Sequence, residues 1–300
     1  MSEIINITNL NFHYGNFKVL DDLNLSVKEN SIFGFLGPNG AGKTTTIKIL
    51  LGLLSTPKNK VSLFHKNLKT DRIEILSKVG SLVENPSIYN HLTAIENLKI
   101  LTTMLHLKSS MIDEVLKIVG LDYIANKKAG KFSTGMKQRL GIAKALISDP
   151  QLIILDEPTI GLDPKGIIEI RELLLTLNKE YGKTIFLSSH NLSEVDKICD
   201  EIGIIDNGHI LFRGTKDDLN SYNKTSLIIK ADNIKEVCYV LSNTKIECKI
   251  TEDNSVKTPF ISDIITSFLI RTLVENDIQI YSVEKEEITL EELFINIISS

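Results

Sequence analysis

Gly37-Pro38-Asn39-Gly40-Ala41-Gly42-Lys43-Thr44 is the stretch that decides the fold of this 300-residue chain. A glycine, four residues and then Gly-Lys-Thr is the pattern of a phosphate-binding loop, whose glycines let backbone N–H groups point at phosphate oxygens. Lys43 would supply a cation for the β and γ phosphates, and Thr44 a hydroxyl for Mg²⁺. A buried strand is expected before the loop, over residues 31–36, and a helix after Lys43. The stretch therefore predicts binding of ATP and Mg²⁺.

An apolar run that ends in two carboxylates predicts the second part of the site. Residues 152–155 are all leucine or isoleucine, which predicts a central parallel strand, and Asp156 and Glu157 follow directly. Ligands bind at the carboxyl ends of the strands in parallel sheets. We expect Asp156 to lie on the Mg²⁺ side and Glu157 to polarise an attacking water. The alternative is an exposed acidic turn, because Pro158 follows, but the phosphate loop favours the catalytic interpretation.

Three further positions are candidates on weaker grounds. Ser133 is a good N-cap for a helix over residues 136–147, and the start of a helix binds anions well. His190 follows an expected strand, but a lone histidine is more often structural. Tyr14 precedes the loop in a hairpin turn, where a lone tyrosine is usually a packing residue. From these residues alone, the functional and the structural interpretations both stay open.

Strands that alternate with helices predict an α/β layered domain over residues 1–218. Antiparallel strands are expected at 5–8 and 23–27, and Asn207-Gly208 predicts a hairpin turn. Helical periodicity covers 94–107, 111–119, 136–147 and 166–181. The sequence therefore predicts a large nucleotide-binding domain followed by a separate segment.

That segment, residues 219–300, has the pattern of a small C-terminal accessory α+β module. Strands are expected at 226–230, 245–250 and 278–283, with a short additional strand, and helices at 234–241, 261–274 and 290–298. The order is compatible with a ferredoxin-like arrangement. Its polar residues form no recognisable site, so packing or dimerisation is the expected role, with regulation as an open alternative.

Composition excludes several classes of partner. Net charge is −4, from 34 basic and 38 acidic residues, which argues against nucleic acid. No run of about 18 apolar residues occurs, so no direct membrane span is expected, and the N-terminus lacks the features of a signal peptide. Three cysteines without metal-site spacing predict reduced thiols. These features favour a cytoplasmic protein, which would reach a membrane only through a partner.

The order of these motifs over residues 4–218 resembles that of the nucleotide-binding subunits of ABC transporters. The resemblance implies a P-loop NTPase fold with antiparallel β and helical subdomains. It also implies that Tyr14 stacks on adenine, that residues 37–44 with Thr45 form the Walker A loop, and that Asp156 is the Walker B aspartate. By the same resemblance Glu157 is the catalytic glutamate and His190 the histidine that senses the γ-phosphate.

The resemblance further implies a head-to-tail dimer of two copies around two ATP molecules. Ser133 and Gly135 match the signature motif, which in this family contacts the γ-phosphate of the ATP held by the opposite subunit. Asp163, in Ile160-Gly161-Leu162-Asp163, matches the aspartate of the D-loop at the dimer interface. The other implied partner is an integral membrane permease subunit, which would hold the chain on the inner face of the cell membrane.

Two departures from the family pattern bear on function. Thr134 stands where the signature motif usually has glycine, and Glu84 stands where glutamine usually follows the Walker A loop. A carboxylate can also bind Mg²⁺, so Glu84 is a third candidate metal ligand beside Thr44 and Asp156. With the signature Phe-Ser-x-Gly-Met-Lys-Gln-Arg and the C-terminal extension, Glu84 makes the chain similar to the bacitracin-resistance and lantibiotic-immunity exporter ATPases. That similarity implies export of peptide antibiotics.

Two other functions remain as alternatives. A non-transport ABC ATPase acting on ribosomes or DNA usually carries two such domains or a long coiled coil, which this sequence lacks. A nucleotide sensor without turnover is suggested by Glu84 and Thr134, but Asp156 and Glu157 are both present. For an exporter, other drugs or lipids are alternative substrates. The sequence leaves open the substrate, the permease and the role of the C-terminal module.

Overall fold

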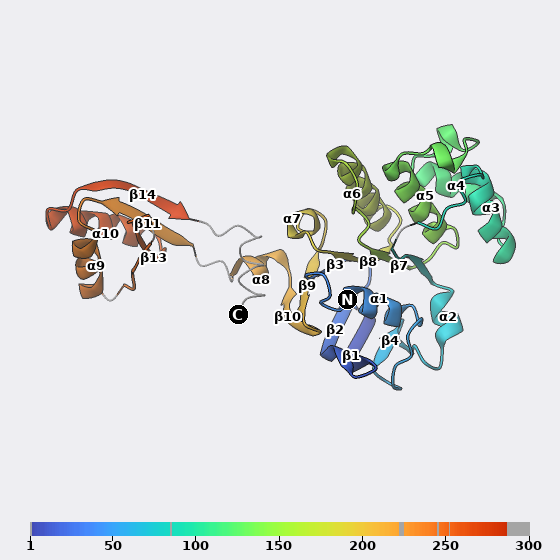
Figure 1. The fold of residues 1–300 in the computed structure, drawn as a ribbon, viewed down its shortest axis with the longest axis horizontal. Coiled ribbons are helices and arrows are strands. Elements are labelled where there is room, and N and C mark those ends of the chain that lie inside the picture. Colours follow the sequence, from blue (N-terminus) through green and yellow to red (C-terminus); the bar gives the residue numbers. More distant parts are fainter. Residues whose placement is uncertain (1, 85, 222–224, 245, 252, 287–300) are drawn as a thin grey trace. The chain divides into compact units, whose positions relative to one another are not determined.

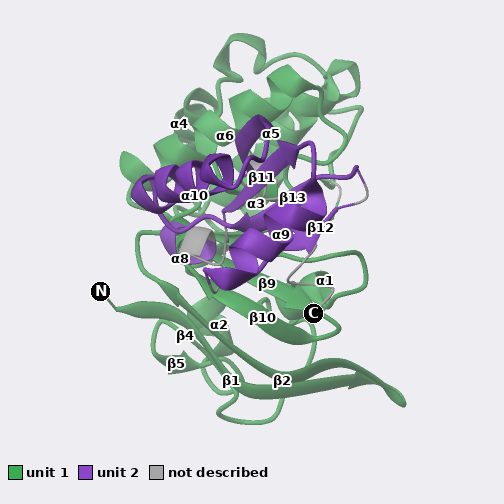
Figure 2. Ribbon diagram, turned by 90° about the vertical axis from the view of Figure 1, so that its left-hand side faces the viewer, with its two compact units in different colours: residues 1–216 green, residues 217–300 purple. Residues whose placement is uncertain are grey.

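The structure is a computed structural model that describes residues 2–84, 86–221, 225–244, 246–251 and 253–286, without the side chains of residues 193, 194, 220 and 221. It contains two compact units, Met1–Lys216 and Asp217–Ser300, which Figure 2 distinguishes by colour. Each unit has its own apolar core.

A six-stranded sheet forms the centre of the first unit (Figure 1), with the strand order β10-β9-β3-β8-β7-β6. Its strands are β3 Ile32–Leu36, β6 Val79–Leu82, β7 Leu152–Asp156, β8 Thr184–Ser189, β9 Glu201–Asp206 and β10 His209–Gly214. Every pairing is parallel except that of β9 with β10. Strands β3, β7 and β8 are buried along their whole length, as their continuous apolar runs predict. The expected central strand and the Asn207-Gly208 hairpin are thus confirmed.

An antiparallel sheet of order β2-β1-β4-β5 forms a second layer of this unit. Its strands are β1 Glu3–Tyr14, β2 Phe17–Lys28, β4 Val61–Leu63 and β5 Lys66–Asn67. Tyr14 pairs with Phe17, and Gly15 has a φ of 57°, so the expected hairpin turn is confirmed. Apolar side chains of this sheet pack with those of β3 and of the helix after the phosphate loop in one core.

Helices cover the central sheet and form a helical region at one end of the unit (Figure 1). They are α1 Lys43–Leu50, α2 Arg72–Leu76, α3 Ala94–Met104, α4 Ser110–Ile118, α5 Thr134–Leu146, α6 Pro164–Lys179 and α7 Leu192–Val195, with short 3₁₀ turns at Asp122–Ile124 and Ala129–Lys131. The helix expected to reach residue 107 ends three residues earlier, because His106 adopts a left-handed φ of 55°. Ser133 caps α5, as its sequence position predicts.

The second unit has the chain order of a ferredoxin-like fold. Helix α8 Lys216–Ser221 begins at the last residue of the first unit. The second unit then contains β11 Ser226–Ala231, α9 Ile234–Asn243, β12 Lys249–Ile250, β13 Val256–Pro259, α10 Asp263–Glu275 and β14 Ile280–Glu286. The antiparallel sheet has the order β12-β13-β11-β14, in which the first and last long strands lie side by side. The α+β prediction is therefore confirmed, while the helix expected over 290–298 lies outside the described residues.

None of the described helices is both long and apolar enough to cross a membrane.

Candidate functional site

The phosphate loop joins the buried strand β3 to helix α1. Gly40 and Gly42 have φ values of 85° and 111°, which side chains rarely allow. A Cβ at Gly37 would lie 2.3 Å from the carbonyl oxygen of Ile205, so the backbone there is packed too closely for any other residue. An open hollow lies over the loop, lined by Val19, Pro38, Asn39, Gly40, Gly42, Lys43, Thr44, Thr45 and Glu157.

Lys43 is the cation of this hollow, and it is only 6% exposed. Its Nζ donates to the carbonyl oxygens of Gly37, at 2.7 Å, and Pro38, at 3.2 Å. It also lies 3.4 Å from Oε1 of Glu157. All three partners are oxygen acceptors, as phosphate oxygens are, so the position suits a phosphate ligand.

The N-terminus of α1 faces the same loop without a cap of its own. Gly42 occupies the N-cap position, and no described side chain accepts a hydrogen bond there; the first turn contains no acidic residue. The first N–H groups of a helix need acceptors, and the positive end of the helix dipole favours an anion. The start of α1 is therefore suited to bind phosphate oxygens.

Asp156 and Thr44 meet at the end of β7. The Thr44 hydroxyl donates to Oδ2 of Asp156 at 3.0 Å, and the Ser188 hydroxyl donates to Oδ1 at 2.5 Å. Asp156 is 4% exposed. In the described part of the chain, no cluster of three or more acidic, histidine or cysteine side chains could hold a metal. Two oxygen donors nevertheless fit Mg²⁺, which usually takes one or two carboxylates and completes its shell with water and phosphate oxygens.

Glu157 is held in an unusual backbone conformation beside this pair. Its φ is 49°, a left-handed value that costs energy in residues other than glycine. Its N–H donates to the Ser188 hydroxyl at 2.9 Å. The carboxylate lies between Lys43 and His190, whose Nδ1 is 2.9 Å from Oε2. The structure thus brings Lys43, Glu157 and His190 into one chain of polar contacts.

Four of the predicted nucleotide-binding residues lie outside both the phosphate loop and the lining of the hollow over it. Tyr14 is 48% exposed and makes an edge-to-face contact with Phe12, with 5.1 Å between ring centroids. Ser133 is exposed and accepts from the Met136 N–H at 3.2 Å.

Gly135 and Asp163 are the other two. A Cβ at Gly135 would meet no described atom within 4 Å. Asp163 is the N-cap of α6, where its carboxylate accepts from the Gly166 N–H at 2.9 Å.

Glu84 has a different partner from the one predicted. Its carboxylate lies 3.2 Å from Nζ of Lys48, on α1, and its side chain is 66% exposed. No described contact joins it to Thr44 or Asp156, so its role as a metal ligand stays a prediction.

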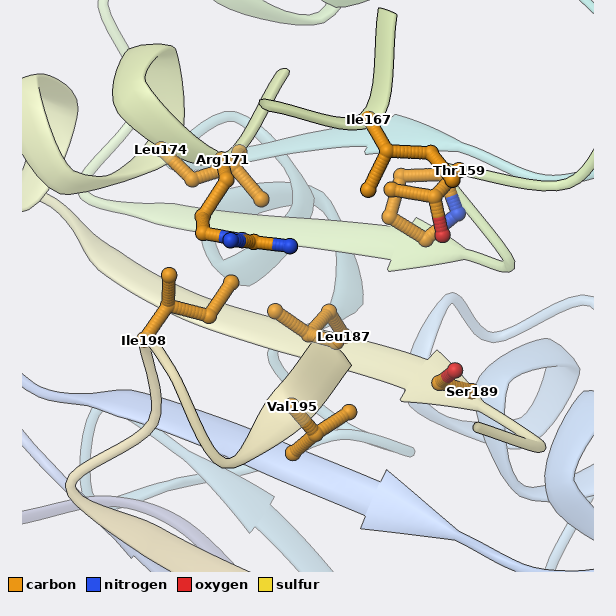
Figure 3. A pocket seen from close by; sticks show the side chains of 9 residues that line it. Thr159, Ile167, Arg171, Leu174, Leu187, Ser189, Val195 and Ile198 are labelled. Carbon is orange, nitrogen blue, oxygen red and sulfur yellow. The ribbon is translucent and has the colours of Figure 1, made fainter. Parts of the chain in front are cut away.

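A second, smaller hollow lies between helix α6 and the C-terminal part of β8 (Figure 3). Thr159 and Ser189 line it, two residues after Glu157 and one residue before His190. Arg171 extends into it from α6, beside Leu187 and Ile198. Apart from Thr159, Arg171 and Ser189, the residues that line it are apolar.

Ser188 is the residue that sequence reasoning missed. Its hydroxyl contacts both Asp156 and the backbone of Glu157, so it fixes the positions of two neighbouring candidate residues. The available signal was a serine directly after an expected strand, two residues before His190 in the sequence.

Comparison with known proteins gives matches along most of the chain. The family described as "ABC transporter" matches residues 20–160. The bacitracin transport ATP-binding protein BcrA of Bacillus licheniformis is 43% identical over 99% of this chain and 98% of its own length. The lantibiotic transport ATP-binding protein SrtF of Streptococcus pyogenes is 45% identical over 69% of this chain and 89% of its own.

Solved structures give the same picture. CbiO1 of Clostridium perfringens, part of the ABC transporter complex CbiONQ, matches with a TM-score of 0.69 and 25% identity over 81% of this chain and 98% of its own. An ATP-binding cassette solved as a dimer in a post-hydrolysis state with ADP and phosphate matches with a TM-score of 0.62 and 26% identity, over 70% and 98%.

Proposed function

The chain belongs to the ABC transporter family, as a subunit that binds and hydrolyses ATP, and we propose that it powers a peptide-antibiotic exporter. Its reaction converts ATP and water to ADP and phosphate. The observation that carries the residue assignment is the chain of contacts from Lys43 through Glu157 to His190 beside the phosphate loop.

In the proposed mechanism the loop holds the phosphates and the strand ends act on the water. Lys43 and the N–H groups at the start of α1 bind the β and γ phosphates. Thr44 and Asp156 would hold Mg²⁺, which neutralises phosphate charge when bound. Glu157 orients and polarises the attacking water, and His190 holds the Glu157 carboxylate through the contact at 2.9 Å.

We infer that a second copy completes each site. Ser133 and Gly135 lie at the start of α5, outside the lining of the hollow over the loop, and the space around Gly135 is open. A γ-phosphate presented by a second copy would meet the positive end of this helix. The dimeric solved relative with ADP and phosphate supports this arrangement.

We infer a bacitracin- or lantibiotic-type substrate and a separate membrane permease. BcrA matches almost the whole chain, the second unit included, and SrtF matches 69% of it. On this proposal the permease would provide the path across the membrane. On this proposal the chain works at the cytoplasmic face of the membrane. The test is bacitracin and lantibiotic sensitivity of a strain that lacks the chain; unchanged sensitivity to both would contradict the substrate assignment.

The catalytic assignment is tested by Glu157→Gln. The amide keeps the size of the side chain but loses the charge that polarises water, so turnover should fall by about 100-fold or more while ATP still binds. Trapped ATP should then hold two copies together, measurable by size-exclusion chromatography with light scattering. Glu180→Gln, at the far end of α6, is the matched control and should hydrolyse ATP normally. Near wild-type hydrolysis by Glu157→Gln would rule out the assigned role.

A further inference from the structure

Helices α5 and α6 begin at the two motifs that the proposed dimer presents to its partner. Ser133 caps α5 and Asp163 caps α6, each through its side chain. The two helices pack against each other in the helical region (Figure 1). Their relative position therefore sets the distance between the turn that holds Ser133 and Gly135, here called the signature turn, and the D-loop that holds Asp163.

An ion pair joins these two helices at equal distances from their N-caps. Nη2 of Arg139 donates to Oε2 of Glu169 at 2.6 Å. Arg139 lies six residues after Ser133, and Glu169 lies six residues after Asp163. At about 1.5 Å per residue, the pair is about 9 Å along each helix from its N-cap. The ion pair thus joins α5 and α6 at the same distance from their N-caps, less than two helical turns from each motif.

The surroundings of Arg139 make this pair more than a surface contact. Its side chain is 20% exposed and that of Glu169 33%. Nε of Arg139 is buried and has no hydrogen-bond partner. A Cβ at Gly120, just beyond α4, would lie 3.4 Å from Nη1. The guanidinium is therefore enclosed between the end of α4 and α6, and Glu169 is its charged partner there.

We propose that Arg139 and Glu169 are positioning residues that fix the start of α5 against the start of α6. They hold Ser133 and Gly135 in register with Asp163, so that one copy presents both motifs together to the ATP of the other. The inference rests on the head-to-tail dimer of the proposed function. It assigns a role in dimer closure to two residues that do not line the hollow over the phosphate loop.

Lys165 provides the matched control within the same helix. Its Nζ lies 3.9 Å from Oε1 of Glu169, but both residues are on α6 and the Lys165 side chain is 84% exposed. Lys165→Gln removes a cation beside Glu169 without touching α5. If only charge near Glu169 matters, Lys165→Gln and Arg139→Gln act alike; if the link between helices matters, only Arg139→Gln acts.

The experiment measures ATP-dependent dimerisation by analytical ultracentrifugation, in the Glu157→Gln background. Arg139→Gln and Glu169→Gln should each weaken the dimer about tenfold, and Lys165→Gln less than about twofold. The exchange Arg139→Glu with Glu169→Arg should restore affinity to within about threefold of the parent. ATP affinity of the single chain should be unchanged in all variants, because the phosphate loop is not altered.

The outcomes separate this inference from the function on which it rests. If the parent does not dimerise with ATP, the proposed function fails and the inference with it. If the parent dimerises and Arg139→Gln or Glu169→Gln dimerises as tightly, the inference alone is overturned. The charge exchange also tests the inference, provided that thermal unfolding shows the variant to be folded. If this folded variant still dimerises weakly, the inference is overturned, because a positioning ion pair should work whichever helix carries the positive charge.

Discussion

The phosphate loop and the signature turn both lead into a helix, but they satisfy that helix in opposite ways. At the loop, α1 has no side-chain cap, and Lys43 is enclosed by acceptors of its own chain. At the turn, Ser133 caps α5, and the space that a side chain at position 135 would enter is open. In the first region the polar groups contact one another, but the start of the helix has no side-chain cap. In the second region the start of the helix is capped, and the predicted contact residues are open to a partner. Under the proposed function, this difference fits a loop that binds nucleotide within one copy and a turn that acts only when two copies assemble.

The largest expected effect comes from removing the cation of the loop. Lys43→Met keeps most of the length of the side chain but removes the charge that would face the phosphates. ATP hydrolysis should fall about a thousandfold, measured by phosphate release, because the site loses its main electrostatic stabilisation of the γ-phosphate. Lys58→Met, at an exposed lysine after α1, is the control and should be fully active. An active Lys43→Met would remove the contrast between the two regions.

A smaller loss of turnover is expected from a change at the signature turn, where the effect on folding stability should be opposite to the effect on activity. Gly135→Asp places a carboxylate in the first turn of α5, where it should stabilise the single chain by about 0.3–1 kcal/mol through the helix dipole. The same charge would face the γ-phosphate of the second copy, so turnover should fall about tenfold or more. Thermal unfolding and phosphate release measure the two effects.

Gly135→Ala serves as the companion variant at this position. Its methyl group enters open space, so its folding stability should change little. Loss of folding stability in Gly135→Asp together with lost activity would show that the turn matters for the single chain and would break the comparison.

The smallest expected effect concerns Ser188. Ser188→Ala leaves Asp156 and the Glu157 backbone each without one hydrogen bond, which should lower turnover about tenfold with ATP affinity kept. Thr184→Ala, at the other end of β8, removes a hydroxyl that accepts from the Asn30 N–H far from the carboxylates. It should lose comparable folding stability but no activity. Equal activity of the two variants would show that Ser188 only supports the strand.

Local patterns predicted the parts of the site that lie within one segment. The strand, loop and helix around Lys43 follow from apolar runs and glycine spacing, and Ser133 was predicted as a cap from its place before a periodic stretch. The ferredoxin-like order of the second unit followed from its sequence of strands and helices.

Contacts that depend on strand register or helix packing were not predictable in this way. Ser188 lies opposite Asp156 because β7 and β8 pair in that register, which joins residues 32 positions apart. The contact of Glu84 with Lys48 likewise depends on where two distant segments meet. A shift of one residue in the pairing of β7 with β8 would turn Ser188 to the other face of the sheet, and the local sequence does not specify that register.

The uncapped start of α1 has a consequence for how the protein persists in a cell. A phosphate bound there supplies the acceptors that the chain itself lacks, so the nucleotide acts as the missing terminal residue of a helix. Any ligand that binds only the folded chain shifts the folding equilibrium toward it, by about 2.7 kcal/mol at a hundredfold excess over its dissociation constant. Nucleotide in the cell should therefore act as a folding ligand of the subunit and raise its free energy of unfolding.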